Sequence, residues 1–124
     1  MSLDLKKLHI ESMTPEPGYD GQVIVPSAGA GLRAQVLGKQ GYHAEDILLV
    51  YWNGRRVFIH TITEVEVQNG VHFYVEKTHV APGDAMVTYT LIDDLTGIPS
   101  DSPELLLKVI PAEEEAEVVF ASQQ

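Results

Sequence analysis

Residues 47–52 form an uninterrupted apolar run between turn residues, and the run ends at the chain's only tryptophan, Trp52. Its β-branched and aromatic residues, followed by the turn Asn53-Gly54, predict a strand. Alternate residues of a strand face opposite sides. One side would carry Leu48, Val50 and Trp52, and the other Ile47, Leu49 and Tyr51. Because both sides are apolar, we expect something to cover the second side.

Further apolar or alternating segments predict more strands, separated by turns rich in glycine and proline. These segments are 23–26, 32–37, 56–62, 63–67, 71–75, 85–92 and 104–110. Residues 3–10 fit a short amphipathic helix as well as a first strand. About seven short strands without a long helix predict an all-β fold, an immunoglobulin-like antiparallel β-sandwich.

The segments around Gln68-Asn69-Gly70 predict a hairpin. A three-residue loop places Val67 opposite Val71 and gives the hairpin one apolar face, with Gly70 in the left-handed conformation. The phases of the strands also predict one buried cluster. Its expected members are Leu48, Val50, Trp52, Phe73, Tyr89 and Leu107.

The chain has 124 residues, enough for one domain with a substantial core. We divide it into an N-terminal arm, 1–14, the sandwich, 15–111, and an acidic C-terminal tail, 112–124. The tail begins with glutamates among alanines and carries an apolar patch, Val118 to Phe120.

The charge balance is acidic, with 18 Asp and Glu against 8 Lys and Arg and a net charge of -10. This argues against nucleic acid or an anionic membrane as a partner, since both require a basic surface. The sequence has no cysteine, and neither a signal peptide nor an apolar membrane-spanning stretch is recognisable. We therefore expect the chain to be cytoplasmic when made, and later part of a virion, exported, or a piece of something larger.

Two segments, GYHAEDILLVYWNG (41–54) and VHFYVEKTHVAPGDAMVTYTLIDDLTGIPSDSPELLLKV (71–109), carry a resemblance in their order and spacing. Over residues 15–110 the chain resembles the bacterial immunoglobulin-like repeats of large surface and secreted proteins. The matching positions are Trp52, Phe73, Tyr89, Gly97 and Pro103. The usual repeat occurs in tandem copies, whereas this chain has one copy. The resemblance implies spacers, adhesins and docking modules, and it carries over no catalytic residues.

Candidate metal ligands are few. His60 and His72 can approach each other across strands with Glu64, and the carboxylates of Asp93, Asp94, Asp101 and Glu104 flank one loop that can hold calcium. Neither set has a recognised ligand spacing, so we expect solvent-facing histidines, an acidic loop, and no metal or cofactor. No catalytic constellation is recognisable, which favours a non-enzymatic protein.

The favoured function is a structural or docking module that binds a protein partner, or a second copy, within a larger assembly. That assembly is a surface or secreted protein or a bacteriophage particle. We expect Leu49, Tyr51 and Phe58 to form the partner-binding patch on the outer face of one sheet. Alternatively, residues 3–10 or 118–120 of the same chain cover this patch. A second function is a carbohydrate-binding module, with Tyr19, Tyr42 and Tyr51 as its aromatic face.

Overall fold

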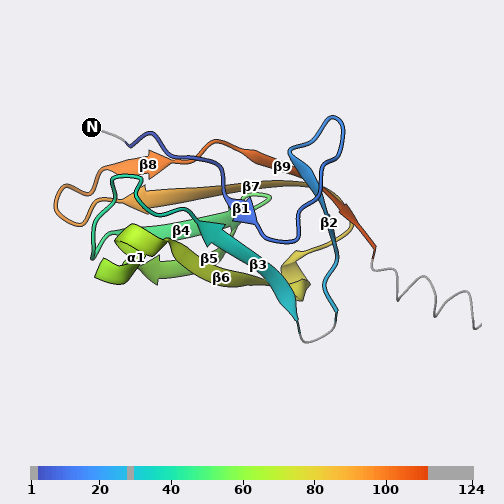
Figure 1. Ribbon diagram of the computed structural model, residues 1–124, viewed down its shortest axis with the longest axis horizontal. Helices are drawn as coiled ribbons and strands as arrows, with labels where there is room; N and C mark the ends of the chain where they lie inside the picture. The colour runs from blue at the N-terminus through green and yellow to red at the C-terminus, as the bar shows by residue number, and fades with distance from the viewer. Residues whose placement is uncertain (1–2, 28–29, 112–124) are drawn as a thin grey trace, which may run out of the picture.

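The computed structural model describes residues 3–27 and 30–111, which form a β-sandwich of two sheets (Figure 1). The larger, six-stranded sheet contains β2 (Gly21–Ile24), β9 (Leu105–Ile110), β7 (Gly83–Ile92), β4 (Ile47–Trp52) and β5 (Arg55–Thr61) in that order, with β8 (Pro99–Asp101) beside β7. The three-stranded sheet contains β1 (His9–Ile10), β3 (Gly31–Val36) and β6 (Val71–Glu76) in that order. The predicted all-β sandwich is confirmed, with nine strands in the described residues where about seven were expected.

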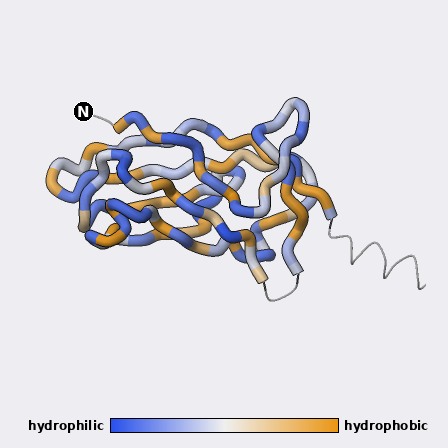
Figure 2. The backbone as a smooth tube through the Cα atoms, viewed as in Figure 1, coloured by the Kyte–Doolittle hydropathy of each residue, from blue (hydrophilic) through white to orange (hydrophobic). Residues whose placement is uncertain are grey.

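The core lies between the two sheets and takes alternate residues from β3, β4, β6, β7 and β9, as the spacing of hydrophobic positions along the chain suggests (Figure 2). On β4, buried and half-buried residues alternate without exception. All six residues predicted to share one buried cluster do so. They are Leu48, Val50, Trp52, Phe73, Tyr89 and Leu107. The period-2 pattern therefore assigned the inward face of these strands correctly.

One pair of strands departs from the antiparallel pairing of the predicted sandwich. β2 lies parallel to β9, with Gly21 opposite Leu107 and Ile24 opposite Ile110. The two strands come from opposite ends of the described chain, so no hairpin constrains their relative direction. The six-stranded sheet is therefore mixed.

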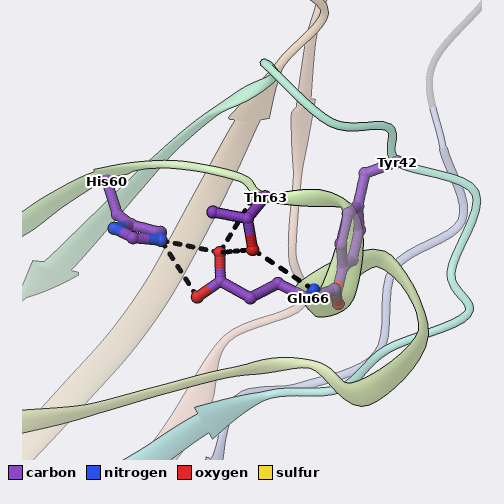
Figure 3. Close-up of polar contacts among 4 residues, drawn as sticks. All are labelled: Tyr42, His60, Thr63 and Glu66. Atoms are coloured by element: carbon purple, nitrogen blue, oxygen red, sulfur yellow. Dashed lines mark hydrogen bonds and ion pairs between the residues drawn. The ribbon is translucent and has the colours of Figure 1, made fainter.

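The predicted hairpin around Gly70 is wrong, because residues 64–69 form the helix α1 (Glu64–Asn69). Thr63 caps it, with its Oγ1 accepting from the Glu66 amide at 3.4 Å while the Glu66 carboxylate accepts from the Thr63 amide at 2.9 Å (Figure 3). This reciprocal pair is a capping box. Val71 lies opposite Val36 on β3 rather than opposite Val67. The described helices α1 and the 3-10 turn η1 (Lys77–His79) are too short to cross a membrane.

The segment before β1 is part of the sandwich. The side chains of Leu5, Leu8 and Ile10 are buried in the core. The Leu3 amide donates to Ser100 Oγ at 2.7 Å, and the Tyr89 hydroxyl donates to the Lys6 carbonyl. Residues 3–8 thus form neither a helix nor a strand, and only residues 9–10 are a strand. The predicted acidic tail, 112–124, lies outside the described residues.

Candidate docking surface

The outer face of the six-stranded sheet is apolar around β4. Between its buried residues, this strand presents Ile47, Leu49 and Tyr51, all half-buried. Ile47 lies opposite Ile92 on β7, and Leu49 lies opposite Ile59 on β5, whose side chain is 58% exposed. We define the docking patch as Ile47, Leu49, Tyr51, Ile59 and Ile92. The residues before β1 pack into the core, so they do not cover this patch.

Phe58, the third predicted partner-binding residue, does not lie on this face. The Asn53-Gly54 turn has φ angles of 51° and 81°, and it sets Tyr51 opposite Arg56. Continued unchanged, this register would put Phe58 opposite Leu49. A bulge interrupts it, so that Phe58 lies opposite Val50 on the inner face. One extra residue in β5 therefore turns Phe58 inward and Ile59 outward.

Phe58 belongs instead to the aromatic side of the core. Its ring stacks on Phe73 of the three-stranded sheet, with centroids 4.4 Å apart and planes 6° apart. It also stacks on His60 of the same strand, with centroids 5.7 Å apart and planes 19° apart. Offset stacking of this kind adds about 0.5–1.5 kcal/mol to the burial of the rings. The role of Phe58 is therefore to join the two sheets.

A cation and a second apolar pair border the docking patch. Arg56 lies directly opposite Tyr51 and is exposed, and it has no ion pair among the residues that the structure describes. Met86 on β7 faces Leu106 on β9, and these side chains are 43% and 40% exposed. Thr88 and Thr90 lie between Met86 and Ile92 on β7, so Met86 and Leu106 form a separate apolar pair beside the docking patch. Arg56 is a positive charge at one border, without an ion pair in the described part of the chain.

The two predicted metal-ligand sets are not assembled. His60 faces inward on β5, opposite Leu48, and its Nε2 lies 2.8 and 3.0 Å from the two oxygens of Glu66. His72 is exposed on the opposite sheet. In the acidic loop, Asp93 Oδ1 accepts from the amides of Leu95 and Thr96, which lower the pKa of this carboxyl. These contacts stabilise the cap of α1 and the turn after β7.

One further group of metal-type side chains meets within 4.8 Å among the described residues: His43, Asp46 and Asp93. Asp46 is buried, and its oxygens already accept from the amides of His43, at 2.8 Å, and Asp94, at 3.0 Å. This carboxylate therefore braces the turn before β4 against the loop after β7. The contacts of Asp46 among the described residues are accounted for by this structural role, and they give no support for a metal site.

The three tyrosines of the predicted sugar-binding face lie apart. Tyr42 is buried, with its hydroxyl 2.9 Å from the Leu37 carbonyl, and burial raises its pKa to about 12. Tyr19 lies in the loop before β2, and its hydroxyl donates to Asp84 Oδ1 at 2.6 Å. Of the three, Tyr51 alone belongs to the docking patch. No common aromatic face is formed by these residues.

Comparisons with known proteins identify no family for this chain. No family model matches the sequence, so the predicted immunoglobulin-like repeat family is not confirmed. The search of curated proteins finds no significant match. One solved structure with a similar arrangement is the adhesin domain of Epf from Streptococcus pyogenes, with a TM-score of 0.47 and 10% sequence identity. The alignment covers 86% of this chain and 33% of that one, so the chain spans about a third of the neighbour's length.

Proposed function

We propose that this chain is a non-enzymatic docking module that binds a protein partner within a larger assembly through the docking patch. The observation that carries the proposal is the apolar outer face of the six-stranded sheet. The outward residues of β4 are all apolar where a solvated sheet face would be polar, and Ile59 on β5 and Ile92 on β7 adjoin them. Threonines occupy the other neighbouring positions: Thr61, Thr88 and Thr90. Contiguous apolar surface of this kind usually marks a binding site for another protein.

The charged residue Arg56, at the border of the docking patch, indicates the kind of partner. The described part of the chain leaves Arg56 without an ion pair beside Tyr51, and an exposed arginine next to an aromatic ring is typical of interface hot spots. A second copy would bring its own net charge of -10, which opposes self-association. The occupant we propose is therefore a different protein, with an apolar contact surface and a carboxylate placed to pair with Arg56. A surface protein, a secreted protein or a bacteriophage particle is the expected setting.

A non-enzymatic role is supported by the carboxylates of Glu66 and Asp46, which make structural contacts. The carboxylate of Glu66 is occupied by the cap of α1 and by His60, and that of Asp46 by two backbone amides. These contacts hold loops and strand ends in place.

Site-specific photocrosslinking tests the proposal. A photoreactive phenylalanine analogue replaces Tyr51 in one variant and Leu95 in another, and the full chain is expressed in its native setting. Leu95 is the matched control, because it is the more exposed apolar residue, at 92%, and lies in the loop after β7. We expect one defined protein adduct from position 51 and none from position 95.

A second substitution shows whether the adduct depends on the patch. Ile59→Asp, combined with the probe at position 51, should abolish the adduct, because it places a charge opposite Leu49 without disturbing the core. Equal labelling at both probe positions, or an adduct that survives Ile59→Asp, would overturn the proposed surface. An adduct between two copies of this chain would overturn the choice of partner.

A further inference from the structure

The outer face of the three-stranded sheet is hollowed along its length. One hollow of about 250 Å³ is lined by His9, Glu11, Arg33, Ala34, Gln35 and His72. It shares Glu11 and Arg33 with a second hollow of about 400 Å³, which reaches Gly31 and Tyr74. That one in turn shares Gly31 and Tyr74 with a third, of about 330 Å³, which ends at Glu76. The three hollows are shallow and adjoin one another along this face, bordered by the side chains they share; together they are here called the polar groove.

Strand register explains why these residues line up. His9, Gln35 and His72 form one row across β1, β3 and β6. The next row along β3 pairs Arg33 with Tyr74, and the last pairs Gly31 with Glu76. Rows on one face of a strand are about 6.6 Å apart, so the groove runs for about 13 Å between its outer rows. This length is enough for a short, extended oligomeric ligand.

Tyr74 and Gly31 form the centre of the groove. Tyr74 is 62% exposed, and its hydroxyl has no hydrogen bond among the described residues. Gly31 packs closely against it, since a Cβ at this position would lie 3.2 Å from the Tyr74 Cβ and 2.8 Å from the Val75 carbonyl, too close for a larger residue. The Tyr74 side chain is thus open to a ligand, and the more polar hollow lined by His9, Gln35 and His72 lies further along the groove.

The polar walls offer both donors and acceptors. The Arg33 guanidinium and the Glu11 carboxylate lie 3.1 Å apart as an exposed ion pair. Gln35 supplies an amide that donates and accepts, and each neutral imidazole of the flanking histidines does the same. Planar side chains of this kind, around one exposed aromatic ring, match a sugar, which has an apolar ring face and hydroxyls at its edge.

Other ligand classes fit less well. His9 and His72 lie on strands separated by β3, about 9.6 Å apart across the sheet, which is wide for a shared metal ion. Carboxylates at Glu11 and Glu76 oppose nucleic acid, as does the net charge of -10. Unlike the docking patch, the groove carries a charged or amide side chain in every row, namely Gln35, Arg33 and Glu76, which suits a polar ligand better than an apolar protein surface.

We propose that the polar groove is an oligosaccharide-binding site, with Tyr74 as the stacking platform and Arg33, Gln35 and the two histidines as hydrogen-bonding groups. This site is on the opposite side of the sandwich from the docking patch and does not depend on it. It also differs from the tyrosine face expected from the sequence, because Tyr19, Tyr42 and Tyr51 take no part in it.

The test is a titration of the full chain with a panel of short neutral and carboxylated oligosaccharides, followed by NMR. We expect at least one panel member to bind with a Kd below about 1 mM and to shift the side-chain signals of Arg33 and Gln35. Tyr74→Ala should weaken this binding at least about tenfold, while Tyr74→Phe, which keeps the ring, should retain it. Both substitutions are at an exposed side chain, and dispersed amide spectra would verify that each variant is folded.

Tyr19→Ala is the matched control, since it removes a tyrosine on another surface of the molecule and should leave sugar binding unchanged. The proposal is overturned if no panel member binds below about 1 mM. It is equally overturned if binding survives Tyr74→Ala or if it is lost in Tyr19→Ala. Crosslinking at Tyr51 reports on the other sheet, so either proposal can fail while the other stands.

Discussion

The bulge in β5 decides which of two neighbouring residues, Phe58 or Ile59, faces the core. Substituting each residue in turn and measuring the free energy of unfolding tests this assignment directly. Phe58 faces inward and stacks on Phe73, whereas Ile59 faces outward and is 58% exposed. We expect Phe58→Ala to destabilise the fold strongly and Ile59→Thr to leave its stability almost unchanged. Threonine keeps β-branching, so the second substitution tests exposure rather than strand propensity.

The size of the first effect follows from the packing of Phe58. Truncating a fully buried phenylalanine costs about 3–5 kcal/mol, including the cavity left behind. Phe58 is only partly buried, so we expect a loss of about 2–3 kcal/mol, of which the stack on Phe73 contributes about 0.5–1.5 kcal/mol. For Ile59→Thr we expect a change within about 0.5 kcal/mol, as is usual for exposed positions.

Urea unfolding followed by fluorescence provides the measurement, because Trp52 is the only tryptophan and is buried, at 4% exposure. With an m-value of about 1–3 kcal/mol/M, Phe58→Ala should lower the unfolding midpoint by on the order of 1 M. Phe58→Leu is the control that keeps most of the apolar volume. Equal losses for the two positions, or a larger loss for Ile59→Thr, would refute the bulge and return Phe58 to the docking patch.

Two further predictions concern the segment around α1. Gly70 has a φ of 85°, and a Cβ there would lie 2.5 Å from the Val36 carbonyl; Gly70→Val should therefore lower the free energy of unfolding by more than about 1 kcal/mol in the same urea assay. Burial raises the pKa of Glu66, but hydrogen bonds from His60 and Thr63 outweigh it and hold the pKa below its ordinary value. The stability from this carboxylate is present above its unfolded-state pKa and is lost as the pH falls through the folded-state pKa. Glu66→Gln should accordingly flatten the acid side of the stability–pH profile, and an unchanged profile would contradict this contribution.

The features that could be predicted from the sequence depend on neighbours along the chain. The strand at residues 47–52 was predicted with its observed bounds, because turn residues surround an apolar run. Its inward face followed from period-2 alternation, and Trp52, Phe73 and Tyr89 fell in the predicted core for the same reason. Burial on one face specifies these phases strongly.

The misplaced hairpin shows how two local signals can compete. Asn69-Gly70 between apolar runs favours a hairpin, while Thr63 followed three residues later by Glu66 favours a helix start. The structure takes the second, with the cap strengthened by His60. That contact joins β5 to α1 only after the chain has folded, so residue spacing alone could not rank the two signals.

The face of Phe58 could not be read from the sequence, because a bulge is one extra residue without a compositional mark at Val57. Counting forward from the Asn53-Gly54 turn gives the wrong face for every β5 residue after the bulge at Val57. The parallel pairing of β2 with β9 was unpredictable for a related reason, since it joins segments more than eighty residues apart along the chain. In both cases long-range burial, rather than local pattern, decides the outcome.

The two proposed surfaces differ in how they arise from the sequence. The docking patch centres on one continuous strand, so its apolar character was visible as a run of residues. The polar groove combines β1, β3 and β6, and its residues become neighbours only through sheet register. Because the two surfaces are the outer faces of opposite sheets, a ligand on one leaves the other open. The two proposals are therefore independent in geometry: the proposed protein partner at Tyr51 and the proposed sugar at Tyr74 would not compete for the same surface.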